Sequence, residues 1–161
     1  HNAGAECASG SAWLPLCGAR LSGKNRHQYA VVYLITQLKE KNYDFIEQEM
    51  AGIVEECRSA GAISKVIFEN CYLTEEEKRA LCSIAREVRP DFIKTSTGFG
   101  TGGATFEDVA LMKKCVGDEV KIKAAGGIRT LDTALRMIEL GVSRIGSTAS
   151  VSIVEELKRT L

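Results

Sequence analysis

The segment DFIKTSTGFGTGGATFEDVALMKKCVGDEVKIKAA, residues 91–125, decides the fold. Short β-prone runs open and close it at residues 91–96 and 120–125, and Val109, Met112 and Val116 recur between them at helical spacing. This order predicts two parallel strands joined by a crossover helix, because a parallel neighbour is reached only across the face of the sheet.

The same alternation continues on both sides of this segment. Strands are predicted at residues 65–69 and 144–147, with a fifth at residues 29–35. Helices are predicted where apolar residues share one face: Ile46, Met50, Ile53, Val54 and Cys57; Leu81, Ile84, Ala85 and Val88; Leu131, Ala134, Leu135 and Ile138; Val154, Leu157 and Leu161. Helix starts are predicted at Thr74 with Glu77, Thr105 with Asp108, Thr130 with Asp132, and Ser152 with Glu155. The fold class is therefore α/β with a parallel sheet.

Composition excludes several classes of partner. The 161 residues carry 21 Lys+Arg and 21 Asp+Glu, so no excess of positive charge attracts nucleic acid or an anionic membrane. The longest uncharged stretch, residues 7–19, is shorter than the roughly 20 apolar residues of a membrane span. Six cysteines without a C-x-x-C pair, and only two His, predict neither a zinc cluster nor a disulfide framework. Reduced thiols and the lack of a signal-peptide pattern predict a cytoplasmic protein.

Two lysines stand at corresponding places in neighbouring strands. Lys94 lies four residues before Gly98, and Lys123 lies four residues before Gly127. A strand buried on both faces rarely carries lysine, so a simple alternative is that each ammonium reaches water at a strand end, as we expect for Lys121. If both lysines point to one side, like charge and a dry surrounding favour the free amine, which is how a Schiff-base nucleophile is activated.

Glycine-rich turns follow three of the predicted strands. Residues 98–103 match G-x-G-x-x-G, but an acid that would bind ribose is missing from the end of the next strand, so a dinucleotide site is the weaker interpretation. Gly126-Gly127 and Gly146-Ser147-Thr148 each lead into a helix, where backbone N–H groups can hold a phosphate. Arg129 either adds charge there or lies at the surface, and the turns are equally explained as helix starts.

Several segments together resemble the deoxyribose-phosphate aldolases. The resemblance covers residues 35–161 and rests on residues 92–99, 102–109 and 123–130, with residues 65–69 and Leu73-Thr74 in support. It implies a (β/α)8 barrel that cleaves 2-deoxy-D-ribose 5-phosphate to D-glyceraldehyde 3-phosphate and acetaldehyde, without metal or cofactor. It also implies that Lys94 is the Schiff-base nucleophile and that Lys123 lowers its pKa and assists proton transfer. Substrate and phosphate would contact the turns that contain Thr97, Gly98, Gly126, Gly127, Gly146, Ser147 and Thr148.

The resemblance also marks what this chain lacks. A full barrel needs about 250 residues, so residues 35–161 are expected to form only the last four to five strand–helix units. The family's relay acid aligns with Ala30, and residues 1–34 are atypical, which we interpret as a truncated or frame-shifted segment. Unpaired strand edges predict a homo-oligomer or an aggregate. Two alternatives to the aldolase remain open: a non-catalytic fragment of such an enzyme, and a nucleotide-binding oxidoreductase that uses residues 98–103.

Overall fold

The computed structural model describes residues 28–32 and 35–161, with side chains described from residue 35 onward. Our interpretation of residues 1–34 lies outside these residues, apart from the backbone of the first strand. The elements in chain order are β1 (Gln28–Val32), α1 (Ile35–Lys39), α2 (Tyr43–Ser59), β2 (Ile63–Ile67), η1 (Asn70–Tyr72), α3 (Glu75–Val88), β3 (Phe92–Lys94), α4 (Phe106–Val116), β4 (Lys121–Ala125), α5 (Leu131–Glu139), β5 (Val142–Gly146) and α6 (Ser150–Thr160).

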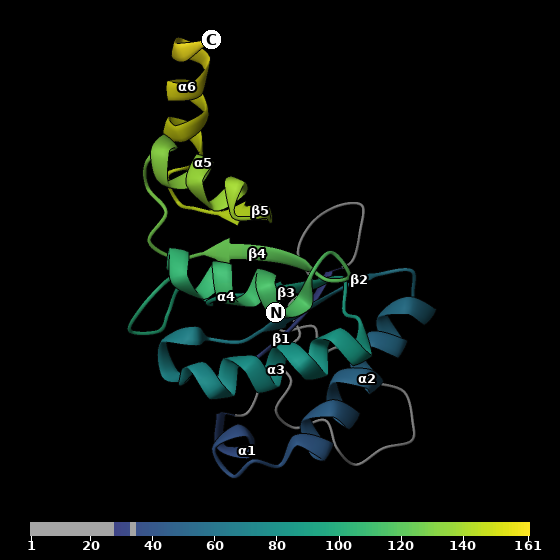
Figure 1. Ribbon diagram of the computed structural model, residues 1–161. Helices are drawn as coiled ribbons and strands as arrows, with labels where there is room; N and C mark the ends of the chain where they lie inside the picture. Colours follow the sequence, from purple (N-terminus) through teal and green to yellow (C-terminus); the bar gives the residue numbers. More distant parts are fainter. Residues whose placement is uncertain (1–27, 33–34) are drawn as a thin grey trace, which may run out of the picture.

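The five described strands form one parallel sheet in the order β1-β2-β3-β4-β5. Each new strand is added on the same side of the previous one, so right-handed crossovers place every connecting helix on the same face. Helices α2, α3 and α4 lie side by side over that face, while α6 extends away from it at the chain end (Figure 1). This winding is that of a barrel, and the strand order does not reverse among the five described strands. The dinucleotide interpretation of residues 98–103 loses its structural context, because such cofactors bind at that reversal.

The hydrophobic core lies between the sheet and the helices. Alternate strand residues such as Val66, Ile93 and Ile122 point toward the helices and belong to one buried cluster with residues from α2 to α5. The residues between them, including Lys94 and Lys123, point to the opposite face, which in a closed barrel is the interior. The face of the sheet toward the helices therefore forms the core, and the opposite face carries the candidate functional side chains.

The strands differ from their predicted limits. The strand predicted at residues 65–69 runs from Ile63 to Ile67, because Glu69 adopts a left-handed conformation with φ of 55° that ends the extended run. The strand predicted at residues 91–96 keeps only Phe92–Lys94. The last strand begins two residues earlier than predicted, at Val142. Ile35, the last residue of the first predicted strand, instead begins α1.

Two helical predictions were wrong in part. Helix α6 begins at Ser150 and has no side-chain cap, whereas Ser152 donates to the Ala149 carbonyl. The earlier start follows from the turn before it, where the Ala149 N–H donates to the Ser147 hydroxyl. In α5 the predicted face is also rotated. Leu135 and Ile138 are 43% and 54% exposed, while the unpredicted Met137 is buried.

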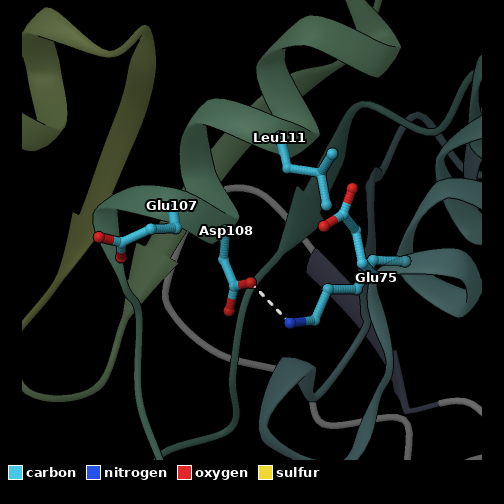
Figure 2. A pocket seen from close by; sticks show the side chains of 5 residues that line it. Glu75, Glu107, Asp108 and Leu111 are labelled. Carbon is cyan, nitrogen blue, oxygen red and sulfur yellow. Dashed lines mark hydrogen bonds and ion pairs between the residues drawn. The ribbon is translucent and has the colours of Figure 1, made fainter.

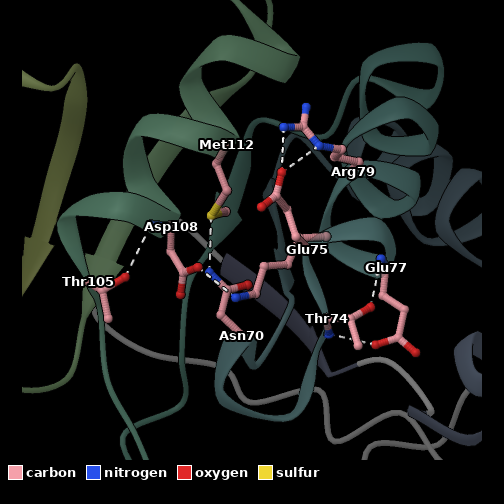
Figure 3. A network of polar contacts seen from close by, with 9 residues as sticks. Asn70, Thr74, Glu75, Glu77, Arg79, Thr105, Asp108 and Met112 are labelled. Atoms are coloured by element: carbon pink, nitrogen blue, oxygen red, sulfur yellow. Dashed lines mark hydrogen bonds and ion pairs between the residues drawn. The ribbon is translucent and has the colours of Figure 1, made fainter.

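The other three predicted helix starts are confirmed. Thr74 and Glu77 form the reciprocal capping box of α3, and Thr105 and Thr130 each accept a backbone N–H at the start of α4 and α5. Figure 3 shows the first two of these starts beside the contacts that join α3 to α4. No helix in the described ranges has the length and apolar character of a membrane span.

A half-buried ion pair fastens α3 to α4. The Lys78 ammonium lies 2.6 Å from an Asp108 carboxylate oxygen, and the two side chains are 14% and 13% exposed. By contrast, the Arg159–Glu155 pair on α6 spans 4.0 Å between well-exposed side chains. Partial burial makes the first pair sensitive to loss of one partner, because the remaining charge is poorly hydrated.

We therefore predict that Lys78→Met lowers the free energy of unfolding by about 1 to 3 kcal/mol. The double variant Lys78→Met, Asp108→Leu should recover part of that loss, since it leaves no unpaired charge. Urea unfolding followed by circular dichroism measures both. The control, Arg159→Met, should cost less than about 0.5 kcal/mol, and an equal loss in both single variants would contradict the assignment.

Candidate active site

Lys94 and Lys123 are register partners on adjacent strands. Lys94 of β3 lies directly opposite Lys123 of β4, as Phe92 lies opposite Lys121. Since neighbouring strands are about 4.8 Å apart and both lysines share one face, the two side chains start side by side. The pairing expected from the sequence is confirmed, and Lys121, nearer the strand start, is exposed as expected.

Burial and like charge act together on this pair. Burial lowers the pKa of Lys94, the nearby Lys123 ammonium lowers it further, and the Glu69 carboxylate acts in the opposite direction. Burial also lowers the pKa of Lys123, with a second contribution from Arg144. Each effect disfavours the charged ammonium, so a larger share of free amine is present near neutral pH than for an ordinary lysine.

Two further cations, Lys65 and Arg144, lie near the Lys94–Lys123 pair, and neither was predicted as a site residue. Lys65 of β2 is only 6% exposed, and burial together with Lys123, Arg144 and Lys94 lowers its pKa to about 8. Arg144 is the register partner of Lys123 on β5, and its guanidinium lies 4.5 Å from the centre of the Phe92 ring. The signal for Lys65 was present in the sequence, because it too is a lysine within a strand buried on both faces.

The turns at the carboxyl ends of the strands are joined to one another. The Ala104 N–H donates to the Gly126 carbonyl at 3.0 Å, and the Ser147 hydroxyl donates to the Ile128 carbonyl at 2.6 Å. These bonds link the turns after β3, β4 and β5. The glycine-rich turns of the sequence analysis therefore meet at one edge of the sheet.

The individual turn residues differ in exposure and engagement. Gly98, Gly127, Arg129 and Thr148 are exposed, while Gly126, Gly146 and Ser147 are half-buried. A Cβ on Gly146 would lie 3.1 Å from Lys123 Cε and 3.7 Å from its Nζ, so the Lys123 head lies against this turn. Thr97 is already engaged, because its N–H and its hydroxyl both donate to the Glu69 carboxylate.

A separate hollow of about 280 Å³ lies between α3 and α4, on the helical side of the sheet (Figure 2). It is lined by Glu75, Lys78, Glu107, Asp108 and Leu111. Its walls carry three carboxylates, which repel a phosphate, and it faces away from Lys94. Within the described part of the chain, no group of His, Cys, Asp or Glu side chains is arranged to bind a metal ion.

The one-directional parallel sheet and the lysine pair at its carboxyl edge define a class, that of α/β-barrel enzymes with their site at the strand ends. Solved structures support the class. A structure described as QR15, an aldolase, matches with a TM-score of 0.74 and 45% identity over 81% of this chain and 59% of its own. A deoxyribose phosphate aldolase from Aeropyrum pernix, described as having a unique tetrameric structure, matches with a TM-score of 0.72 and 27% identity over 83% of this chain and 56% of its own.

Sequence comparison narrows the class to a family. Deoxyribose-phosphate aldolase of Lactobacillus acidophilus is 56% identical over 137 residues, which are 85% of this chain and 57% of the relative. That of Thermococcus kodakarensis is 55% identical over 125 residues, which are 78% of this chain and 56% of the relative. No protein-family model matches the chain. The chain is similar to the deoxyribose-phosphate aldolases over about four fifths of its own length, and it spans somewhat more than half the length of these relatives.

The lowered lysine pKa values predict that stability rises with pH. The pKa of Lys65 is about 8 in the folded chain and ordinarily 10.5, so between these values the unfolded chain binds more protons. The free energy of unfolding then increases with pH, and Lys94 and Lys123 act in the same direction. Urea unfolding across this window should show the rise.

The variant Lys65→Met should flatten that pH dependence, because it removes one of the groups that release a proton on folding. Lys114→Met, at an exposed position on α4, is the matched control and should leave the slope unchanged. A slope that is the same in all three proteins would contradict the assignment of Lys65.

Proposed function

We propose that this chain carries the reactive centre of a deoxyribose-phosphate aldolase, with Lys94 as the Schiff-base nucleophile. The reaction is the reversible cleavage of 2-deoxy-D-ribose 5-phosphate to D-glyceraldehyde 3-phosphate and acetaldehyde. The observation that carries the proposal is the register pairing of Lys94 with Lys123, with the pKa of each lowered by burial and by a neighbouring cation. Such an amine is nucleophilic near neutral pH.

Lys94 and Lys123 have different tasks in this proposal. The Lys94 amine attacks the aldehyde carbon of the open-chain sugar, and loss of water gives a protonated imine. The imine draws electrons from the bond between C2 and C3, so that bond breaks, the C3 hydroxyl loses its proton and D-glyceraldehyde 3-phosphate leaves. The remaining enamine takes a proton at carbon, and water releases acetaldehyde. Lys123, beside Lys94, keeps the amine uncharged and carries protons.

The phosphate is held at the joined turns. The turn with Gly126 and Gly127 and the Gly146-Ser147-Thr148 turn are linked by the hydrogen bond from Ser147 to Ile128, and the second leads into α6, where the helix dipole favours an anion. The Lys123 head against Gly146 adds positive charge. Thr97 and Gly98 line the neighbouring turn, with the Thr97 hydroxyl held by Glu69.

The alternative of a non-catalytic fragment is supported by alanine at the position of the family's relay acid. Ala30, which aligns with that acid, is the register partner of Lys65 on β1, so an acid there would stand beside this cationic group. Alanine at this position contributes no carboxylate. Measured activity separates the two functions.

Self-association and a cytoplasmic location complete the proposal. Leu135 and Ile138 of α5, with Val151 and Val154 of α6, are exposed apolar side chains on two helices that pack together. A second copy of the chain would cover this surface, in keeping with the tetrameric relative. The four cysteines among the described residues are free thiols, which is the usual state in a reducing compartment.

Borohydride trapping tests the reaction. Incubation with acetaldehyde and sodium borohydride should give a reduced adduct on Lys94, located by peptide mass spectrometry, and Lys94→Arg should abolish it. Lys123→Met should raise the pH needed for trapping, because the neighbouring positive charge is gone. No adduct on Lys94 in a chain shown to be folded would reject the aldolase and favour the non-catalytic fragment.

Light scattering tests self-association. The chain should form a species larger than its 17.5 kDa monomer, and Ile138→Lys combined with Val154→Lys should reduce its size. A matched pair of lysines placed at the exposed polar positions Ser152 and Thr160 should have no effect. A monomer in the parent chain would contradict this part of the proposal.

A further inference from the structure

The loop that follows Lys94 is held by one carboxylate from the neighbouring strand. Both oxygens of Glu69 accept the Thr97 N–H at 3.1 Å, and Glu69 also accepts the Thr97 hydroxyl in a short hydrogen bond. The Thr97 hydroxyl oxygen in turn accepts the Phe99 N–H at 3.1 Å. One side chain thereby fixes the backbone from residue 97 to residue 99.

The burial and the backbone conformation of Glu69 are consistent with its contact with Thr97. Glu69 is 5% exposed, and its left-handed backbone ends β2 and turns the side chain toward the loop. A Cβ on Gly100 would lie 3.1 Å from a Glu69 oxygen and 2.8 Å from Cys71 Sγ, so the loop passes closely over the carboxylate. The cost of burying a carboxylate is offset here by the Thr97 N–H, which both oxygens share, and by the Thr97 hydroxyl.

Glu69 also stands beside the proposed nucleophile. The N–H groups on either side of it, of Phe68 and Asn70, donate to the carbonyls of Lys94 and Thr95 at 2.9 Å. Its charge opposes the effects of burial and of Lys123 on the pKa of Lys94. The charged groups that face Lys94 are thus Lys123 from β4, Lys65 from β2 and Glu69 after β2, with Arg144 of β5 acting on Lys123.

We propose that Glu69 is a positioning residue of the aldolase site, with two effects: it fixes the Thr97–Gly98 turn on which the phosphorylated substrate rests, and it supplies a negative charge that acts on Lys94. This inference rests on the proposed function. It adds Glu69 as a residue that contacts neither the reacting atoms nor the phosphate of the substrate. Its two effects are separable, because one depends on the reach of the side chain and the other on its charge.

Two variants separate reach from charge. Glu69→Gln keeps the length and one acceptor but removes the charge. Glu69→Asn removes both, and asparagine tolerates the left-handed backbone at this position. Glu76→Gln, at an exposed position on α3, is the matched control. For each protein, the yield of the acetaldehyde adduct is measured across a pH series. The concentration of 2-deoxyribose 5-phosphate that gives half-saturation and the rate of amide hydrogen exchange at Thr97 are measured as well.

The expected results differ between the variants. In both, the pH of half-maximal acetaldehyde trapping at Lys94 should fall by about 0.5 unit or more, because the opposing charge is gone. Glu69→Asn should also exchange the Thr97 amide faster and need about tenfold more 2-deoxyribose 5-phosphate for half-saturation, while Glu69→Gln changes these two less. The control should match the parent.

A merely structural role would lower stability alone. Unchanged trapping pH, half-saturation and Thr97 exchange in folded Glu69→Asn would overturn the proposal. If the folded parent gives no adduct at all, the aldolase function fails, and Thr97 exchange still decides whether Glu69 holds the turn: faster exchange in Glu69→Asn supports that role, and equal exchange rejects it.

Discussion

The structure depends on placing two lysines beside each other on one partly buried face of the sheet. Parallel pairing in a fixed register sets Lys94 opposite Lys123, and no side-chain choice can separate them without shifting a strand. A one-residue shift of either strand would turn its lysine toward the helical core, where burying an ammonium is costly. Ile93 and Ile122, which precede the two lysines and are register partners of each other, are fully buried on the opposite face and hold the register.

Much of this was predictable from the sequence, because register and periodicity obey simple rules. The strand–helix alternation, three capped helix starts and the pairing of the two lysines all follow from spacing. The strand limits did not, because Glu69 ends β2 through a backbone conformation that spacing does not reveal. The face of α5 was misjudged since Leu135 and Ile138 are apolar yet exposed, and only a structure shows which apolar side chains are covered.

The site shows the same division. Lys94 and Lys123 stood out as lysines in buried strands, and the same rule applied to Lys65 would have found it. Arg144 and Glu69 could not be found this way, because their roles depend on contacts across strands: a ring contact with Phe92 for the first, hydrogen bonds to Thr97 for the second. Long-range contacts of this kind are set by tertiary structure rather than by local pattern.

The charge balance of the site is the centre of the account. Neighbouring cations among Lys65, Lys94, Lys123 and Arg144 lower the pKa values of the three lysines. Among the described residues, Glu69 is the carboxylate that raises the pKa of Lys94. The direct measurement is an NMR titration of the intact chain carrying ¹³Cε-labelled lysine, with Lys94 and Lys123 assigned from their arginine variants. Both lysines should titrate below 10.5, the ordinary pKa of lysine. Titration of both at that value in the folded chain would contradict it.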